Sequence, residues 1–156
     1  MRIVFVIAAL LLASPVLRTA SAASMDSQPA PTLRSPDYNK GKQAIEDKNW
    51  SLALASFKQA LSKDPNNADI YSYMGFAYRK SGDLDSAFKS YGEALKIDPQ
   101  HKGAHEYVGE AYLQANNLAK AEEHLAALDK ICIFSCEEYR TLKKAVDDYK
   151  QQQAKK

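Results

Sequence analysis

The chain has 156 residues, of which 46% are hydrophobic and 26% charged, and its formal net charge is +2 at pH 7. This length allows one domain of ordinary size. Charges of both signs are interspersed along the chain, which indicates a solvated surface and excludes the strong basic field that draws proteins to nucleic acid or anionic lipid.

The first 22 residues are predicted to be an export signal rather than part of the fold. Arg2 precedes an apolar run from Ile3 to Ala13, and Ala20-Ser21-Ala22 has the small-x-small form of a cleavage site. The alternative is an uncleaved anchor, but the run is too short to span a bilayer stably. We therefore expect cleavage after Ala22 and export, in the manner of a bacterial periplasmic protein.

Removal of the signal changes the charge balance. The signal carries Arg2 and Arg18 and no acid, so the remaining chain has 19 basic and 19 acidic residues and no net charge. Residues 23–35 are rich in Ser, Pro and small residues and are predicted to be a flexible linker. The folded domain is expected to cover residues 36–151.

A period of 34 residues runs through the rest of the chain. Gly41, Gly75 and Gly109 keep this spacing. The same step relates three alanines, three large apolar residues and two prolines: Ala53, Ala87 and Ala121; Phe57, Tyr91 and Leu125; Pro65 and Pro99. A fixed period of this length indicates one supersecondary unit copied along a solenoid.

The middle copy, from Ala68 to Pro99, shows what the unit is. Its apolar residues fall on one stripe of a first helix and one stripe of a second, with Ser81-Gly82-Asp83 between them. This unit resembles a tetratricopeptide repeat, a helix-turn-helix of 34 residues. The resemblance implies an all-α fold, a right-handed superhelix of three repeats with a C-terminal capping helix. The repeats are expected over residues 34–67, 68–101 and 102–131.

The repeated positions have local physical roles. A small residue at Gly75 or Gly109 is expected to let the two helices of one repeat approach closely, while Tyr78 and Tyr112 fill the space between neighbouring repeats. The first copy has the smaller Ala44 at this aromatic position and is the weakest match. Because no single repeat can bury its apolar face alone, stability is expected to come from stacking.

Cys132 and Cys136 are the two cysteines of the chain. In an exported protein such a pair favours a disulfide, and a bend between two helices brings the Cα atoms near the required ~4.4–6.8 Å. A reactive redox pair is the alternative, because a thiol near a helix N-terminus has a lowered pKa. A metal site would need further ligands, which only the three histidines could supply: His101, His105 and His124. No metal site is predicted.

The capping helix is predicted over residues 136–150. Ser135 and Glu138 fit a capping box, with Ser as the cap and Glu three places on. The apolar residues of this helix have amphipathic spacing: Tyr139, Leu142, Ala145, Val146 and Tyr149. The resemblance implies that they cover the exposed side of the third repeat. Residues 152–156 are expected to be a disordered tail.

In this family the first helix of each repeat lines a concave groove in which ligand peptides usually lie. The resemblance therefore implies groove residues, which are Tyr38, Asn39, Lys42, Asp69, Tyr73, Phe76, Arg79, Lys80, Glu106, Tyr107 and Glu110. The aromatic members suit binding anchors because they bury much area for little loss of rotamer entropy. The clamp with which cytosolic chaperone adaptors grip a terminal carboxylate is not reproduced, since Lys42 alone is basic among the corresponding positions.

The sequence holds no catalytic constellation of the usual kinds. Gly-x-Ser-x-Gly is absent, and no Gly-rich loop follows a predicted strand. Adjacent acids such as Glu122 and Glu123 do not face each other on a helix. We therefore expect no enzymatic activity, no cofactor, no metal and no nucleic-acid partner.

The sequence thus predicts an exported scaffold or adaptor that binds another protein, or a peptide segment of one, and is not stably inserted in a membrane. Two alternatives stay open. One is a homotypic assembly protein of the cell envelope that associates through residues 34–49 or the capping helix, as a homo-oligomer. The other is an envelope redox factor that works through Cys132 and Cys136.

Overall fold

The fold is given by a computed structural model that describes residues 35–155. The predicted signal (1–22) and nearly all of the predicted linker (23–35) lie outside these residues. Residues 35–155 form helices and no strand, which confirms the all-α prediction: α1 (Pro36–Glu46), α2 (Trp50–Lys63), α3 (Ala68–Ser81), α4 (Leu84–Ile97), α5 (Lys102–Gln114), α6 (Leu118–Ile131) and α7 (Glu137–Gln153). Within this range no helix combines the length and the apolar character that crossing a membrane requires.

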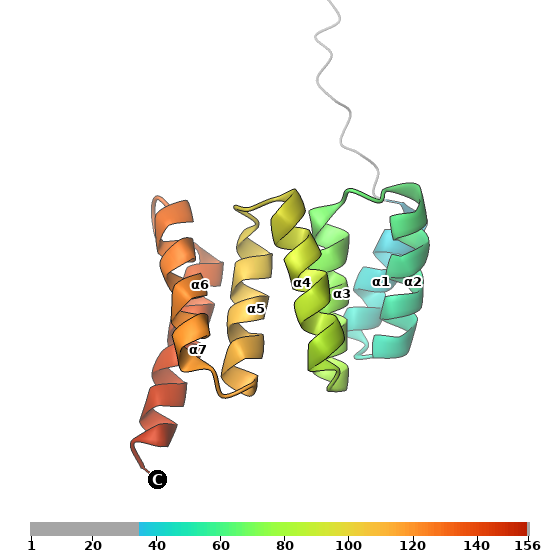
Figure 1. Ribbon diagram of the computed structural model, residues 1–156. Coiled ribbons are helices and arrows are strands. Elements are labelled where there is room, and N and C mark those ends of the chain that lie inside the picture. The colour runs from blue at the N-terminus through green and yellow to red at the C-terminus, as the bar shows by residue number, and fades with distance from the viewer. Residues whose placement is uncertain (1–34, 156) are drawn as a thin grey trace, which may run out of the picture. The chain divides into compact units, whose positions relative to one another are not determined.

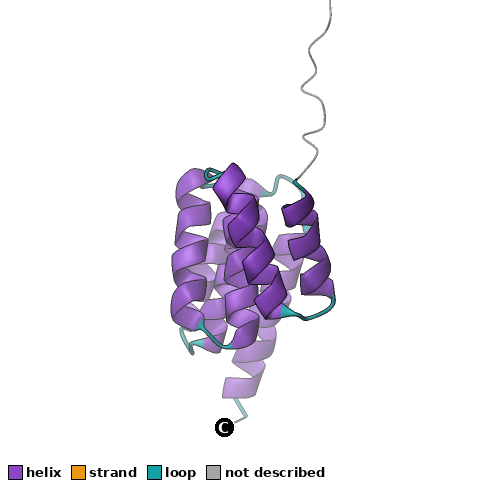
Figure 2. Ribbon diagram, turned by 90° about the vertical axis from the view of Figure 1, so that its right-hand side faces the viewer, coloured by secondary structure: helices purple, strands orange, loops and turns teal. Residues whose placement is uncertain are grey.

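The helices stand side by side in chain order, from α1 and α2 at one end to α6 and α7 at the other (Figure 1). Each repeat is a helical hairpin: α1 with α2, α3 with α4, α5 with α6. Short loops join successive helices at the top and bottom of the array (Figure 2). The first helices α1, α3 and α5 contact one another along the array, whereas the second helices do not. The face formed by the first helices is therefore the inner, concave one.

The turn inside each hairpin repeats with the sequence. The second helices begin at side chains that accept a hydrogen bond from the backbone N–H three residues on, at 3.0–3.1 Å: Asn49, Asp83 and Asn117. This cap satisfies one of the N–H groups that a helix start leaves unpaired. The residue before each cap has a positive φ, which is 55° at Lys48, 93° at Gly82 and 58° at Asn116. The period of 34 is thus also a period of the backbone.

Two glycines allow close contact inside the first two repeats. A Cβ at Gly41 would come within 3.0 Å of the Phe57 ring, and a Cβ at Gly75 would come equally close to the Tyr91 ring. Both rings are fully buried. This confirms the predicted role of Gly75, which is to bring two helices of one repeat together.

The prediction for Gly109 is wrong. The atoms nearest to a Cβ at Gly109 belong to Leu142 of α7, within 3.0 Å, rather than to a residue of α6. The third repeat carries Leu125 where the first two carry Phe57 and Tyr91, and this leucine is only partly buried. The capping helix therefore supplies the side chain that packs on the third glycine, and Leu142 is fully buried.

Helix α7 packs on both α5 and α6 through Leu142 and Val146. It begins at Glu137, with Cys136 as its N-cap and no side-chain capping hydrogen bond, so the predicted capping box of Ser135 and Glu138 is wrong. The backbone of Cys136 is extended, which starts the helix one residue later than the box requires. Instead, Arg140 Nη1 donates to the carbonyl oxygen of Ser135 at 2.6 Å.

The C-terminal end of α7 lies beyond the predicted one. The helix continues through Gln153, so Gln152 and Gln153 are helical and do not belong to a disordered tail. Lys150 in the last turns of α7 forms an ion pair with Glu122 of α6 at 2.6 Å. Glutamine and lysine are good helix formers, which explains why the helix runs on past its buried part.

The loop between α6 and α7 carries the predicted disulfide. Cys132 and Cys136 are bonded, with their Cα atoms 5.6 Å apart. Cys132 is buried at the C-terminus of α6. Ile133 and Phe134, which follow it in the loop, are exposed. The disulfide therefore fixes where α7 leaves α6.

Candidate binding groove

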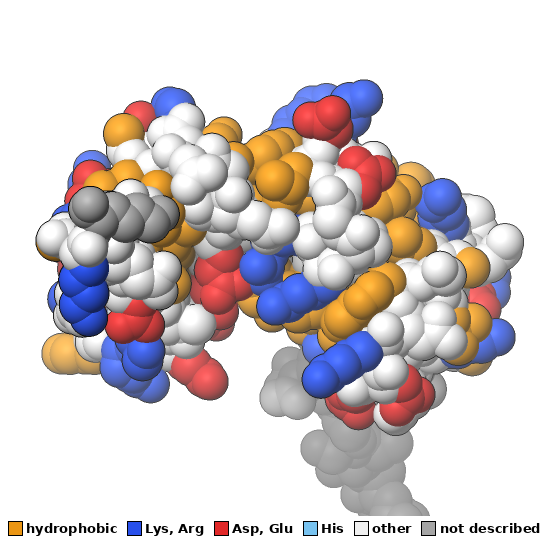
Figure 3. Space-filling model, turned by 90° about the horizontal axis from the view of Figure 1, so that it is seen from below, with side chains coloured by type: hydrophobic (Ala, Val, Ile, Leu, Met, Phe, Trp, Pro, Cys, Tyr) orange, Lys and Arg blue, Asp and Glu red, His pale blue; other side chains and the backbone are white. Residues whose placement is uncertain are grey.

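The inner face of the array is hollowed between the end that holds α7 and the middle of the molecule. Figure 3 shows this hollow from below, with acidic side chains on the wall nearer α7 and basic and hydrophobic side chains on the opposite wall. All of the predicted groove residues come from the helices α1, α3 and α5 that line this face. Their side chains differ greatly in how much they offer to a ligand.

Aromatic rings follow the inner face from α1 to α5. Tyr73 stacks on Phe57 with ring centroids 5.8 Å apart and meets Tyr38 edge-on at 6.0 Å. Phe76 of α3 lies 5.0 Å from Tyr107 of α5. Tyr73, Phe76 and Tyr107 are partly buried, so each keeps some surface at the groove.

Two of the predicted groove residues are buried. Tyr38 is 3% exposed and belongs to the core between the first two repeats, so its ring supports Tyr73 and does not line the groove. Arg79 is 7% exposed and forms an ion pair with Glu110 of α5. Sequence position alone placed both on the inner face, but their lengths let them reach the neighbouring helix, where they are covered.

Basic side chains gather on the α1 and α3 side. The Nζ atom of Lys42 lies 3.8 Å from the centroid of the Tyr73 ring, and that of Lys80 lies 5.3 Å from the Phe76 ring. A cation over an aromatic face is attracted by the ring quadrupole. Asn39 on α1 is exposed. These lysines give the first half of the groove a positive edge.

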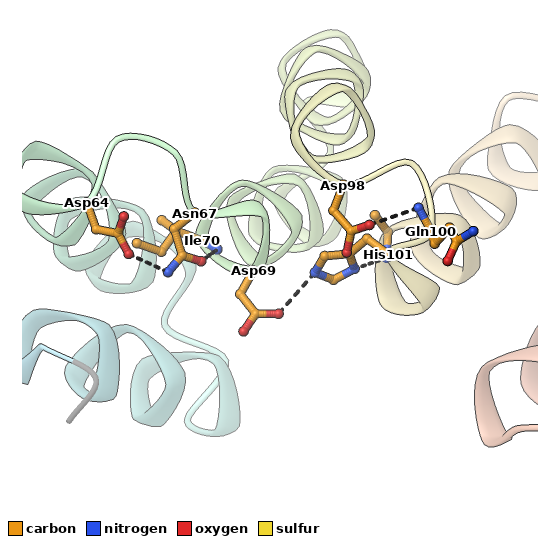
Figure 4. Close-up of polar contacts among 8 residues, drawn as sticks. Asp64, Asn67, Asp69, Ile70, Asp98, Gln100 and His101 are labelled. Atoms are coloured by element: carbon orange, nitrogen blue, oxygen red, sulfur yellow. Dashed lines mark hydrogen bonds and ion pairs between the residues drawn. The ribbon is translucent and has the colours of Figure 1, made fainter. Parts of the chain in front are cut away.

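Three contacts hold α3 and α5 at a fixed spacing. His101 Nε2 and Asp69 Oδ1 are 3.0 Å apart at one end of the helices (Figure 4). Phe76 and Tyr107 meet in the middle, and Arg79 pairs with Glu110 at the other end. The hydrogen bond to Asp69 raises the pKa of His101 above its ordinary value. This half of the groove is therefore preformed.

Carboxylates crowd the wall between α5 and α7. Burial, then the charges of Glu110, Glu138 and Glu137, raise the pKa of Glu106 to about 7, against the opposing effect of Arg79. Burial, then the charge of Glu106, raises the pKa of the Tyr107 hydroxyl, which keeps it neutral. One basic side chain, Arg79, is set against this cluster, so the wall favours a cation.

Sequence reasoning missed the contribution of α7 to this wall. The local pattern does not direct Glu137 and Glu138 toward α5, because the position of the capping helix relative to α5 is set by the disulfide and by the contact of Leu142 with Gly109. One feature of the sequence could have predicted this contribution: two acids stand at the start of a helix that packs on the third repeat. Such acids reach the groove when that helix crosses the end of the groove.

The histidines do not form a metal site. His101 caps α5 through Nδ1, at 3.0 Å from the N–H of Ala104. His105 instead lies with Nδ1 2.9 Å from Nδ1 of His124 and Nε2 3.0 Å from the carbonyl oxygen of Pro99. Among residues 35–155 no group of three or more His, Cys, Asp or Glu is placed to hold a metal ion. His101 therefore connects α5 to Asp69 of α3, and His105 connects α5 to His124 of α6.

Comparison with solved structures shows the same fold elsewhere. The TPR2B domain of yeast Sti1, solved in complex with an Hsp70 peptide, has a TM-score of 0.68 at 20% identity, over 74% of this chain and 94% of that one. The Sgt2 TPR domain of Aspergillus fumigatus has 0.66 at 23%, over 77% and 81%. The Yersinia enterocolitica chaperone SycD, in complex with a peptide of the translocator YopD, has 0.64 at 18%, over 75% and 92%.

Comparison with curated sequences finds shorter matches. Tetratricopeptide repeat protein 16 of human and of Macaca fascicularis is 36% identical over 50 residues, which is 32% of this chain and 6% of the relative. The chain thus spans a small part of the length of these relatives. Sequence profiles of the TPR repeat and of the tetratricopeptide repeat match residues 41–82 and 78–146. With the hairpins, the recurring turns and the buried glycine contacts, these matches show that the chain belongs to the tetratricopeptide repeat family.

Proposed function

We propose that this protein is an exported, non-catalytic scaffold that holds a peptide segment of another protein in the groove formed by α1, α3, α5 and the start of α7. The observation that carries the proposal is the pair Phe76 and Tyr107, which is partly exposed and lies between a basic edge and an acidic wall. Aromatic side chains that are held rigidly and only half covered are the usual anchors of binding sites.

Two of the similar structures support a peptide as the ligand. The Sti1 domain was solved with an Hsp70 peptide, and SycD with a peptide of YopD. Both share the repeat architecture of this chain. In this protein the three contacts between α3 and α5 preform the inner face, which reduces the conformational ordering that peptide binding requires.

The charges of the groove define the segment that would fit. The acidic wall of Glu106, Glu110, Glu137 and Glu138 suits a lysine or arginine. The rings of Phe76 and Tyr107 suit an apolar side chain beside it. Lys42 and Lys80 lie toward α1, so an acidic or neutral residue is favoured at that end. This asymmetry would orient the segment along the groove.

The proposal of export rests on the N-terminal sequence and on the cysteines. Arg2, the apolar run from Ile3 to Ala13 and the small residues before Ala23 have the form of a signal peptide. The disulfide of Cys132 and Cys136 belongs to the kind that persists in oxidising compartments. We place the mature protein in the bacterial periplasm on these grounds.

A display library of random peptides tests the proposal, with the chain from Ala23 to Lys156 as bait. The proposal predicts enrichment of peptides with an apolar residue next to lysine or arginine, and loss of that enrichment with Phe76→Ala/Tyr107→Ala. The matched control is Phe88→Ala on α4, whose ring packs on Tyr112 away from the inner face. Equal enrichment with all three baits would contradict a groove site, provided that their circular dichroism spectra agree.

A further inference from the structure

The loop closed by the disulfide presents two large apolar side chains to solvent. Ile133 is 87% exposed and Phe134 is 91% exposed. The bond between Cys132 and Cys136 ties the two ends of this loop together, so the protruding tip has little freedom to fold back. Neighbouring exposed residues of this size are unusual on a monomer and indicate an interaction surface.

A small hollow with both polar and apolar lining residues lies at the other end of the array. It has a volume of about 140 Å³ and is lined by Asp37, Lys40, Leu52, Ala55, Ser56 and Gln59 of α1 and α2. Leu52 is the third large apolar side chain that is exposed within residues 35–155, at 37%. A cavity of ~150 Å³ accommodates a benzene ring, so this hollow has room for the ring of Phe134.

The two surfaces are on opposite ends of the molecule, as the positions of α2 and of α6 and α7 show (Figure 1). They cannot meet within one chain, but the tip of one copy can reach the hollow of the next. Charge also matches: Lys40 lines the hollow and Glu137 follows the loop, and neither is in an ion pair among residues 35–155.

We propose that copies of this protein associate head to tail, with the Phe134 ring of one copy seated in the hollow between α1 and α2 of the next and Ile133 packed beside it. The contact joins two different surfaces, so it is heterologous and leaves a free tip and a free hollow at the ends of every chain of copies. The groove between α3 and α5 stays open in this arrangement, since neither the tip nor the lining of the hollow includes a residue of these two helices. Association therefore places several binding grooves in one row.

Two blocked variants of the chain from Ala23 to Lys156 test this arrangement. Ile133→Ser/Phe134→Ser removes the tip, and Ala55→Glu fills the hollow from an exposed helix position. In sedimentation velocity from micromolar to millimolar concentration, the unaltered chain is expected to grow in mass, and each variant alone to stay monomeric. Mixed in equal amounts, the two variants are expected to form a dimer and nothing larger, because one tip and one hollow remain.

The control is Ala119→Glu, the same substitution at an exposed position of α6, which is expected to associate like the unaltered chain. Circular dichroism checks that every variant keeps its helicity. An unaltered chain that stays monomeric at millimolar concentration would overturn the proposal. So would continued growth of either variant alone, or a mixture of folded variants that stays monomeric.

Discussion

At the scale of the residue, the contacts of a few small side chains set the spacing of the helices. Gly75 lies so close to the Tyr91 ring that an added Cβ would come within 3.0 Å of it. Gly92, on the outer surface of α4, has nothing near the position of its Cβ. The two glycines have the same intrinsic helix propensity, so they separate the effect of packing from that of the backbone.

We expect Gly75→Ala to lower the free energy of unfolding by about 1–3 kcal/mol, because the buried Tyr91 ring cannot move away. Gly92→Ala is the control and should raise it by about 0.4–1 kcal/mol, since alanine restricts the unfolded chain. Urea denaturation followed by circular dichroism measures both. Stabilisation by both substitutions would show that Gly75 is not a contact point.

The pair His105 and His124 should make stability depend on pH. Burial, then the neighbouring His105, lowers the pKa of His124 to about 4, below the ordinary value near 6.5. Protonation therefore opposes folding, and stability should fall as the pH drops from about 6.5 toward 4. His101 acts in the opposite sense, because Asp69 raises its pKa.

We predict that His124→Gln removes about 1–2 kcal/mol of the loss of stability between pH 7 and pH 4.5, a figure reduced for partial exposure to solvent. Urea denaturation of the two proteins at both pH values measures the difference. Glu123 and Lys120 also act on this histidine, with opposite signs, and remain in both proteins. Parallel pH profiles would contradict the assignment.

At the scale of the element, the capping helix completes the third repeat. Leu142 of α7 packs on Gly109 and is fully buried, whereas Thr141 beside it is exposed. We expect Leu142→Ala to cost about 2–5 kcal/mol, the usual range for a buried leucine. Thr141→Ala, the control on the same helix, should change the free energy of unfolding by less than about 0.5 kcal/mol. Equal small effects would mean that α7 does not seal the array.

The disulfide mainly fixes the position of α7 and contributes little to stability. Its loop is short, so the chain-entropy contribution of the bond is about 2 kcal/mol or less. We expect Cys132→Ser/Cys136→Ser to stay folded, with a lower midpoint in urea, because Leu142 and Val146 still pack α7 against the third repeat. If the protein were a redox factor, the double variant would lose its cellular function while its peptide binding stayed intact.

At the scale of the whole molecule, the sequence predicts the fold better than the binding surface. The period of 34 marks every hairpin, because the glycines, the caps and the left-handed turn residues all repeat with it. The groove depends on contacts between repeats, which no single repeat encodes. The burial of Tyr38 and Arg79, the pairing of Gly109 with Leu142 and the approach of Glu138 to Glu106 all arise from stacking.

The acidic wall predicts how binding depends on pH. Glu106, with a pKa of about 7, is half protonated at neutral pH. A lysine or arginine in the groove would favour the ionised carboxylate, so affinity for a basic peptide should rise as the pH increases through 7, with release of a proton. Titration calorimetry of a peptide selected on the groove, in two buffers of different ionisation enthalpy, measures this release. Glu106→Gln should abolish both the proton release and the pH dependence.

The most direct test of the groove as the binding site is crosslinking inside the cell envelope. A photoreactive amino acid is placed at Lys80, which is exposed beside Phe76, and in a control protein at Lys89, which is exposed on α4. The account predicts one defined partner captured from Lys80 and not from Lys89, and lost when Phe76→Ala/Tyr107→Ala is added. Capture of the same partner from both positions, or its persistence in the folded double variant, would contradict recognition through the inner face.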